Sequence, residues 1–140
     1  MGEYAGFRIG ARASGDLLAF LKERQEEGES LGNTVRRMLE WLRALLRSGE
    51  GELRRALSEQ DLLVVLEALN GAIITPETAS LLWAEVADRL GDDHPVTVRV
   101  RGLSPAGRFA LADLAFRFYR RGGDPRERLR ELVAIPRVVP

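Results

Sequence analysis

Residues 30–47 read SLGNTVRRMLEWLRALLR and carry the clearest amphipathic helix pattern in the chain of 140 residues. The apolar residues recur at intervals of three and four, which places them on one face of an α-helix. They are Leu31, Val35, Met38, Leu39, Leu42, Leu45 and Leu46. Ser30 can cap the first turn with its side-chain oxygen. We therefore expect a helix through Arg47 with more apolar surface than one short helix can cover.

Two shorter elements precede this helix. Ser14, followed by Asp16, predicts the start of another helix, which ends before Gly28. Its apolar residues are Leu17, Leu18, Phe20 and Leu21. Residues 7–12 read FRIGAR and alternate polar or glycine positions with apolar ones, the period of a short β-strand. The expected order is strand, helix, glycine turn and helix.

The remainder of the chain is expected to be a separate helical unit. The two glycines of the sequence Ser48-Gly49-Glu50-Gly51 predict a joint, with one unit over residues 1–48 and another over 52–140. Cap signals predict further helices. They stand at Ser58 with Asp61, at Thr75-Pro76, at Ser104-Pro105 and at Asp124-Pro125. We expect the helix after Ser58 to be central and buried, since residues 62–69 are apolar nearly all round.

A second strand is expected over residues 96–101. Val96, Val98 and Val100 alternate there with polar residues, which is typical of a half-buried strand with a basic outer face. The predicted fold class is therefore mainly α with two short β-strands.

Charge is distributed unevenly although the net charge is zero. The net charge is +1 over residues 1–49, −7 over 50–93 and +6 over 94–140. The acidic and basic segments can neutralise each other within one fold, or the basic segment can form a surface for phosphates or for a protein partner. The arginines of such a partner surface are Arg99, Arg101, Arg117, Arg120, Arg121, Arg126 and Arg130.

The composition argues against an enzyme. There is no cysteine and one histidine, His94, so thiolate chemistry is excluded and no nucleophile–base pair is visible. Asp92, Asp93 and His94 precede Pro95 and read as a turn, so we expect no metal site and no cofactor. No apolar run is long enough to span a membrane and no signal peptide is evident, so a cytoplasmic protein is expected.

With the order strand, helix, glycine turn and helix, and the sequence Gly28-Glu29-Ser30-Leu31-Gly32-Asn33-Thr34-Val35, residues 7–47 resemble the ribbon-helix-helix DNA-binding family of the Arc and MetJ type. In that family, two chains pair their strands into a ribbon that enters the major groove of DNA. The resemblance implies a homodimer that binds double-stranded DNA and regulates transcription.

The resemblance also implies roles for individual residues. It places Arg8, Gly10 and Arg12 on the side of the ribbon that reads bases. It places Ser30, Gly32 and Asn33 at the start of the second helix, where a DNA phosphate is bound. A helical hairpin used only for dimerisation or docking remains the structural alternative for this segment.

Residues 52–133 resemble small uncharacterised helical proteins of bacteria and phages, on the sequence LSEQD at 57–61, EALNG at 67–71 and LSP at 103–105. The resemblance supplies no activity. It leaves open an alternative function, that of a protein-binding regulator, phage-borne, that docks on RNA polymerase, a toxin or another large partner.

Overall fold

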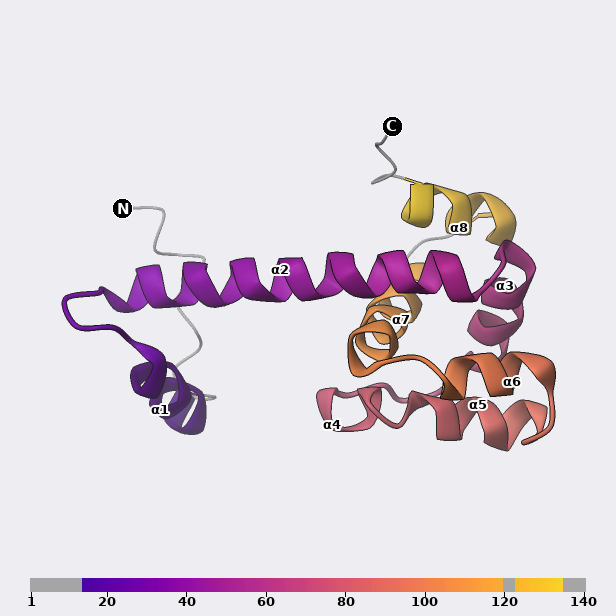
Figure 1. The fold of residues 1–140 in the computed structure, drawn as a ribbon, viewed down its shortest axis with the longest axis horizontal. Coiled ribbons are helices and arrows are strands. Elements are labelled where there is room, and N and C mark those ends of the chain that lie inside the picture. The colour runs from indigo at the N-terminus through magenta and orange to yellow at the C-terminus, as the bar shows by residue number, and fades with distance from the viewer. Residues whose placement is uncertain (1–13, 120–122, 135–140) are drawn as a thin grey trace. The chain divides into compact units, whose positions relative to one another are not determined.

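The computed structural model describes residues 14–119 and 123–134, and every regular element in these residues is an α-helix (Figure 1). The helices are α1 (Ser14–Arg24), α2 (Leu31–Ala56), α3 (Glu59–Ala68), α4 (Pro76–Ala79), α5 (Leu82–Leu90), α6 (Pro95–Arg101), α7 (Pro105–Phe118) and α8 (Pro125–Ala134). The chain divides into an N-terminal unit, Met1–Ala44, and a C-terminal unit, Leu45–Pro140. None of the helices described is long and apolar enough to cross a membrane.

In the N-terminal unit, α1 and the first part of α2 form a hairpin (Figure 1). Both predicted helices are confirmed. The connecting turn contains Gly28 at φ 81°, a conformation that glycine adopts without steric cost. Ser30 caps α2 as expected, because its Oγ accepts a hydrogen bond of 3.1 Å from the backbone N–H of Asn33. The predicted strand over residues 7–12 lies outside the described residues.

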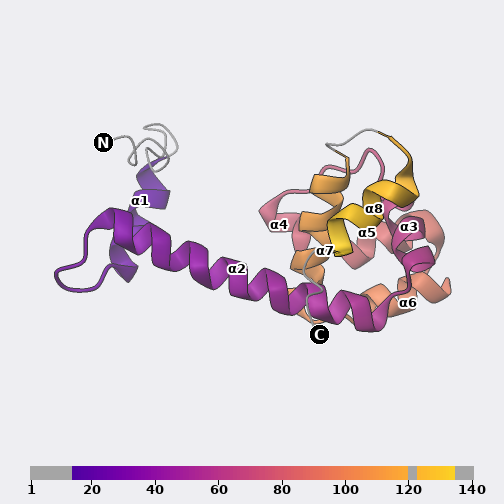
Figure 2. The same ribbon diagram turned by 90° about the horizontal axis from the view of Figure 1, so that it is seen from above.

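The C-terminal unit contains the main hydrophobic core. Helices α3, α5, α6, α7 and α8 gather around it (Figure 2). Its most deeply buried side chains are Val65, Leu66, Leu69, Val86, Val100, Leu111 and Leu129. Three of these belong to α3 or to its C-cap, which confirms that the helix after Ser58 is central and buried.

The predicted caps of the C-terminal unit are confirmed. Ser58 and Asp61 form a reciprocal capping box at α3, and Thr75 caps α4. Ser104 caps α7, and the Asp124 carboxylate accepts from the first amides of α8. Side-chain oxygens at these positions satisfy N–H groups that have no partner inside the helix.

The break in the helix predicted at residues 48–51 is wrong, because α2 continues without interruption to Ala56. Gly49 is buried where α2 passes close to α7. A Cβ at Gly49 would overlap the carbonyl oxygen of Ala106 and lie 2.7 Å from the Cβ of Ala110. Glycine is therefore present in mid-helix because the two backbones nearly touch, and the packing outweighs its low helix propensity.

A second contact joins the same two helices. Glu52 on α2 accepts hydrogen bonds from the backbone N–H and the Oγ of Ser104, at 2.8 and 2.5 Å. These hydrogen bonds lower the pKa of the Glu52 carboxyl below its usual value. A negative charge thus stands at the N-terminal end of α7, where the helix dipole favours it.

The predicted strand over residues 96–101 is also wrong, because Pro95–Arg101 forms helix α6. Pro95 occupies the first helical turn, and His94 Nδ1 accepts a hydrogen bond of 3.1 Å from the N–H of Val96. Val96 and Val100, four residues apart, are buried, whereas Val98 is 53% exposed. Burial follows the helical period, and tertiary packing overrides the β-propensity of valine.

The segment that follows the Thr75-Pro76 cap folds as two helices, α4 and α5. The chain leaves helical geometry at Leu81, which has φ −104° and ψ 21°. Arg108 on α7 donates a hydrogen bond of 3.1 Å to the carbonyl of Ser80 beside the break. A partner distant in sequence therefore satisfies a carbonyl group at the break.

Exchanging the two α2 glycines for alanine is expected to have opposite effects on stability. Gly49→Ala should lower the free energy of unfolding by about 1–3 kcal/mol, because the new methyl group overpacks the contact with α7. Gly51→Ala should raise the free energy of unfolding by about 0.5–1 kcal/mol, because alanine favours a helix over glycine. The new methyl group fits, since only the flexible tip of Arg55 lies near it, at 3.3 Å. Urea unfolding followed by circular dichroism measures both, and equal effects of the two substitutions would contradict the proposed reason for Gly49.

Candidate nucleic-acid interface

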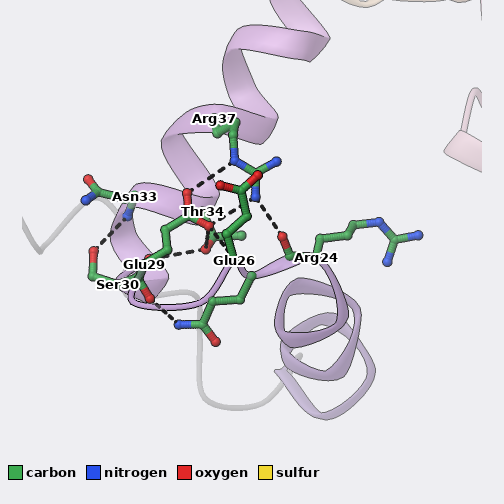
Figure 3. Close-up of polar contacts among 8 residues, drawn as sticks. Arg24, Glu26, Glu29, Ser30, Asn33, Thr34 and Arg37 are labelled. Carbon is green, nitrogen blue, oxygen red and sulfur yellow. Dashed lines mark hydrogen bonds and ion pairs between the residues drawn. The ribbon is translucent and has the colours of Figure 1, made fainter.

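The turn between α1 and α2 is organised around the carboxylate of Glu29 (Figure 3). Its Oε1 accepts hydrogen bonds from the backbone N–H of Glu26 at 2.9 Å and from Thr34 Oγ1 at 2.8 Å. Arg37 donates to both oxygens, from Nη2 at 3.1 Å and from Nε at 3.2 Å. The carboxylate therefore holds the turn and the first part of α2 together.

Arg37 extends this network to the end of α1. Its Nη2 donates a further hydrogen bond of 2.6 Å to the backbone carbonyl of Arg24, the last residue of α1 (Figure 3). The guanidinium also lies 5.5 Å from the ring centre of Trp41, one turn further along α2. Thr34, beneath the pair, is fully buried. We call Arg24, Glu26, Glu29, Thr34 and Arg37 the hairpin clamp.

The clamp stabilises the ionised form of Glu29. The side-chain hydrogen bonds from Arg37 contribute most, followed by the backbone hydrogen bond from Glu26, and together the contacts lower the pKa of the Glu29 carboxyl from 4.5 to about 2. The same hydrogen bonds raise the pKa of Arg37. The pair therefore stays ionised across the physiological pH range.

Ser30, Gly32 and Asn33 lie together at the N-terminus of α2, as predicted. Ser30 accepts a hydrogen bond from the N–H of Asn33, and the N–H of Thr34 donates to the carbonyl of Ser30 at 3.1 Å. Within the described part of the chain, no acceptor is found for the amides of Leu31 and Gly32. A Cβ built on Gly32 would meet no atom within 4 Å, so there is room beside this residue, which is itself half-buried. Free amides at an open helix N-terminus have the chemistry to bind an oxyanion.

The predicted base-reading residues Arg8, Gly10 and Arg12 lie outside the described residues. The structure therefore brings together the three predicted phosphate-binding residues and leaves the ribbon untested. The clamp was not predicted from the sequence, because Glu29 lies in the turn and Arg37 lies eight positions later in α2. No periodicity rule links that spacing, since helix pairing rules cover residues three or four apart on one helix.

The described residues of the N-terminal unit expose most of their large apolar side chains. Leu39 and Trp41 are 52% and 60% exposed, and Leu21 is the only buried apolar residue among those described between positions 14 and 44. The other large apolar side chains that are exposed on this hairpin are Leu17, Leu18, Phe20 and Leu42. Leu45, the next apolar residue of α2, is 44% exposed. A hairpin this small with so little buried surface does not have a core of its own.

The predicted basic partner surface is occupied by ion pairs within the C-terminal unit. Arg99 donates to both oxygens of Asp61 at 3.0 Å, and Arg130 lies 2.8 Å from Glu59. The remaining pairs are Arg101 with Asp92, Arg117 with Glu50 and Asp113, and Arg126 with Glu59. Arg120 and Arg121 lie outside the described residues. Several acidic residues of 50–93 thus pair with arginines that follow them, which agrees in part with the first of the two interpretations of the charge pattern.

The turn at Asp92, Asp93 and His94 has a structural role. His94 caps α6, and Asp92 lies 3.7 Å from Arg101. Over residues 14–119 and 123–134, no three histidine, cysteine, aspartate or glutamate side chains are grouped so that they could hold a metal ion. Candidate functional features among the described residues therefore include a helix end with unpaired amides and an exposed apolar face.

The clamp predicts a pH-dependent contribution to stability. Because the pKa of Glu29 is lower in the folded chain than its ordinary value of 4.5, the stabilisation is complete above that value and is lost as the pH falls towards 2. Glu29→Gln should therefore be less stable than the wild type at pH 7, and the two should converge near pH 2. Thermal unfolding followed by Trp41 fluorescence, with Trp83→Phe in both proteins, measures the difference.

The control is Glu27→Gln, because Glu27 is exposed and no ion pair is found for it among the described residues. It removes the same charge outside the clamp and should leave stability unchanged at every pH. A gap between Glu29→Gln and the wild type that is independent of pH would contradict this role of the carboxylate.

Comparison of the chain with protein-family models, with curated proteins and with solved structures finds no match. The resemblance to ribbon-helix-helix proteins therefore rests on the residues between 7 and 47. Any function assigned to the chain has to be argued from its own surface.

Proposed function

We propose that this protein is a homodimeric DNA-binding transcriptional regulator in which residues 7–47 act as a ribbon-helix-helix unit. The observation that carries the proposal is the N-terminus of α2, where the amides of Leu31 and Gly32 have no acceptor among the described residues and Ser30 and Asn33 are exposed beside them. The clamp holds this helix end in a fixed relation to α1. Helix ends of this kind bind DNA phosphates and set the register of a protein on the duplex.

A second copy of the chain is the partner of the N-terminal unit. Leu21 is the one fully buried apolar residue among those described in the hairpin, and such limited burial does not stabilise a hairpin of this length in water. A strand at residues 7–12 would also need a neighbouring strand for its backbone hydrogen bonds. A second copy supplies both the apolar face and the strand, and the interface is the same patch on each chain.

Sequence reading is assigned to Arg8 and Arg12, with Gly10 between them. An arginine can donate two hydrogen bonds to a guanine edge in the major groove. The arginines of the C-terminal unit that pair with carboxylates are not available for phosphates. In this proposal the two N-terminal units supply the affinity, and we expect modest binding with a marked dependence on salt.

Dimerisation can be tested on the exposed face of α2. Leu42→Glu places a charge among the apolar residues of the proposed interface and should give particles with the mass of one chain, 15.6 kDa. The control is Ala44→Glu, which adds the same charge at an exposed position on the opposite side of the helix and should leave the dimer intact. Light scattering measures both masses, and a wild-type protein with the mass of one chain would overturn the dimer.

Sequence recognition can be tested by selection from random duplex DNA. The wild type should enrich one sequence, with a slope of log affinity against log salt of about −0.9 for each phosphate neutralised. Arg8→Ala with Arg12→Ala should abolish the preference, at about 1–3 kcal/mol for each lost base contact. The control pair is Arg43→Ala with Arg47→Ala, two exposed arginines of α2, which should weaken binding to all sequences alike. Unchanged specificity in the first pair, or no binding by the wild type, would refute the proposal.

A further inference from the structure

The outer face of α5 bears a shallow groove within the C-terminal unit. Its volume is about 380 Å³, and its walls come from α5 and the turn that follows it. It is lined by Trp83, Ala84, Ala87, Asp88, Gly91 and Asp92. Ala84, Ala87 and Gly91 recur at helical spacing, and their small size lets another backbone approach α5 closely. Trp83 and Ala87 are half-buried, and the other lining residues are exposed.

The groove carries negative charge that the fold neutralises only in part. Asp88 is exposed, and the described residues place no cation beside it. Asp92 has Arg101 at 3.7 Å but keeps 81% of its side chain exposed. Elsewhere on the unit, Asp61 lies 3.0 Å from Arg99 and Glu59 lies 2.8 Å from Arg130. The carboxylates of the groove therefore retain capacity for a cation from outside.

Arg101 shows which cation the groove suits. Its guanidinium lies 5.3 Å from the centre of the Trp83 ring as well as close to Asp92. An aromatic ring and a carboxylate together favour arginine over lysine, because the planar guanidinium can stack and donate hydrogen bonds at the same time. Trp83 and Asp92 already bind one guanidinium in this way, and Asp88 stands four positions before Asp92 without one.

We propose that this groove docks an arginine-bearing helical segment of a partner protein, with the backbone of that segment over Ala84 and Ala87 and its arginine at Asp88 and Trp83. Charge complementarity decides the occupant. Two carboxylates repel nucleic acid and anionic membrane surfaces, and attract a cationic side chain. The surface is separate from the proposed DNA-binding residues, so it does not depend on the function proposed above.

The test uses the full-length chain carrying Trp41→Phe, so that fluorescence reports Trp83 alone. The probe is an alanine-based helical peptide of roughly 16 residues with an arginine in every turn. Peptides with lysine or glutamate at the same positions serve as comparison probes. The arginine peptide should shift the Trp83 emission, bind more tightly than the lysine peptide and weaken with salt, and the glutamate peptide should not bind.

Variants of the protein then locate the site. Asp88→Asn should weaken binding about three- to five-fold, since an exposed ion pair or cation–π contact is worth that much. Ala84→Leu should fill the groove and abolish binding without unfolding the chain, because position 84 is exposed. The matched control, Asp93→Asn, removes an exposed carboxylate next to the groove and should have no effect.

Some outcomes would overturn the proposal even in well-folded variants. They are equal weakening by Asp88→Asn and Asp93→Asn, arginine and glutamate peptides that bind alike, and undiminished binding to Ala84→Leu. Circular dichroism of each variant establishes that it is folded. Binding of DNA to Asp88→Asn as to the wild type would show in addition that the two surfaces act independently.

Discussion

The close contact between α2 and α7 is the constraint on which the C-terminal unit depends. At Gly49 the two backbones approach so closely that no side chain fits between them. One turn later, Glu52 caps the start of α7 through Ser104. The same two helices are thus joined by steric fit and by charge. Because α7 contributes many buried residues to the core, the seat of α2 on it constrains how this part of the unit can pack.

The two units use their apolar residues in opposite ways. In the C-terminal unit the leucines and valines of α3, α5, α6, α7 and α8 fill one core. In the described part of the N-terminal unit they lie mostly exposed, and polar contacts of the clamp hold the hairpin together. Hydrogen bonds and an ion pair can fix the geometry of a turn, but they contribute little net stability where water competes. The proposed second copy would supply the burial that the clamp cannot.

The charged side chains of the C-terminal unit also fall into two groups, those that form ion pairs and those that stay exposed. Several arginines of the predicted partner surface pair with carboxylates, as Arg99 does with Asp61. Carboxylates on α5 and the turn after it keep their exposure. The docking surface proposed for this unit is therefore acidic, whereas the linear charge pattern drew attention to the basic residues of its C-terminal third.

The sequence alone determined the helix starts, because a cap needs only a serine, threonine or aspartate beside its own helix. The helices after Ser30, Ser58, Ser104 and Asp124 followed from such local chemistry. The tertiary structure decided the rest. Gly49 predicts a helix break, but its place in the helix is explained by the close approach of α7. Residues 96–100 have the alternation of a strand, but packing against the core selects a helix. Glu29 and Arg37 form their ion pair only once the turn has folded. Local propensities are worth less than one kcal/mol per residue, about 0.7 at most for ordinary residues, so contacts between distant residues outweigh them.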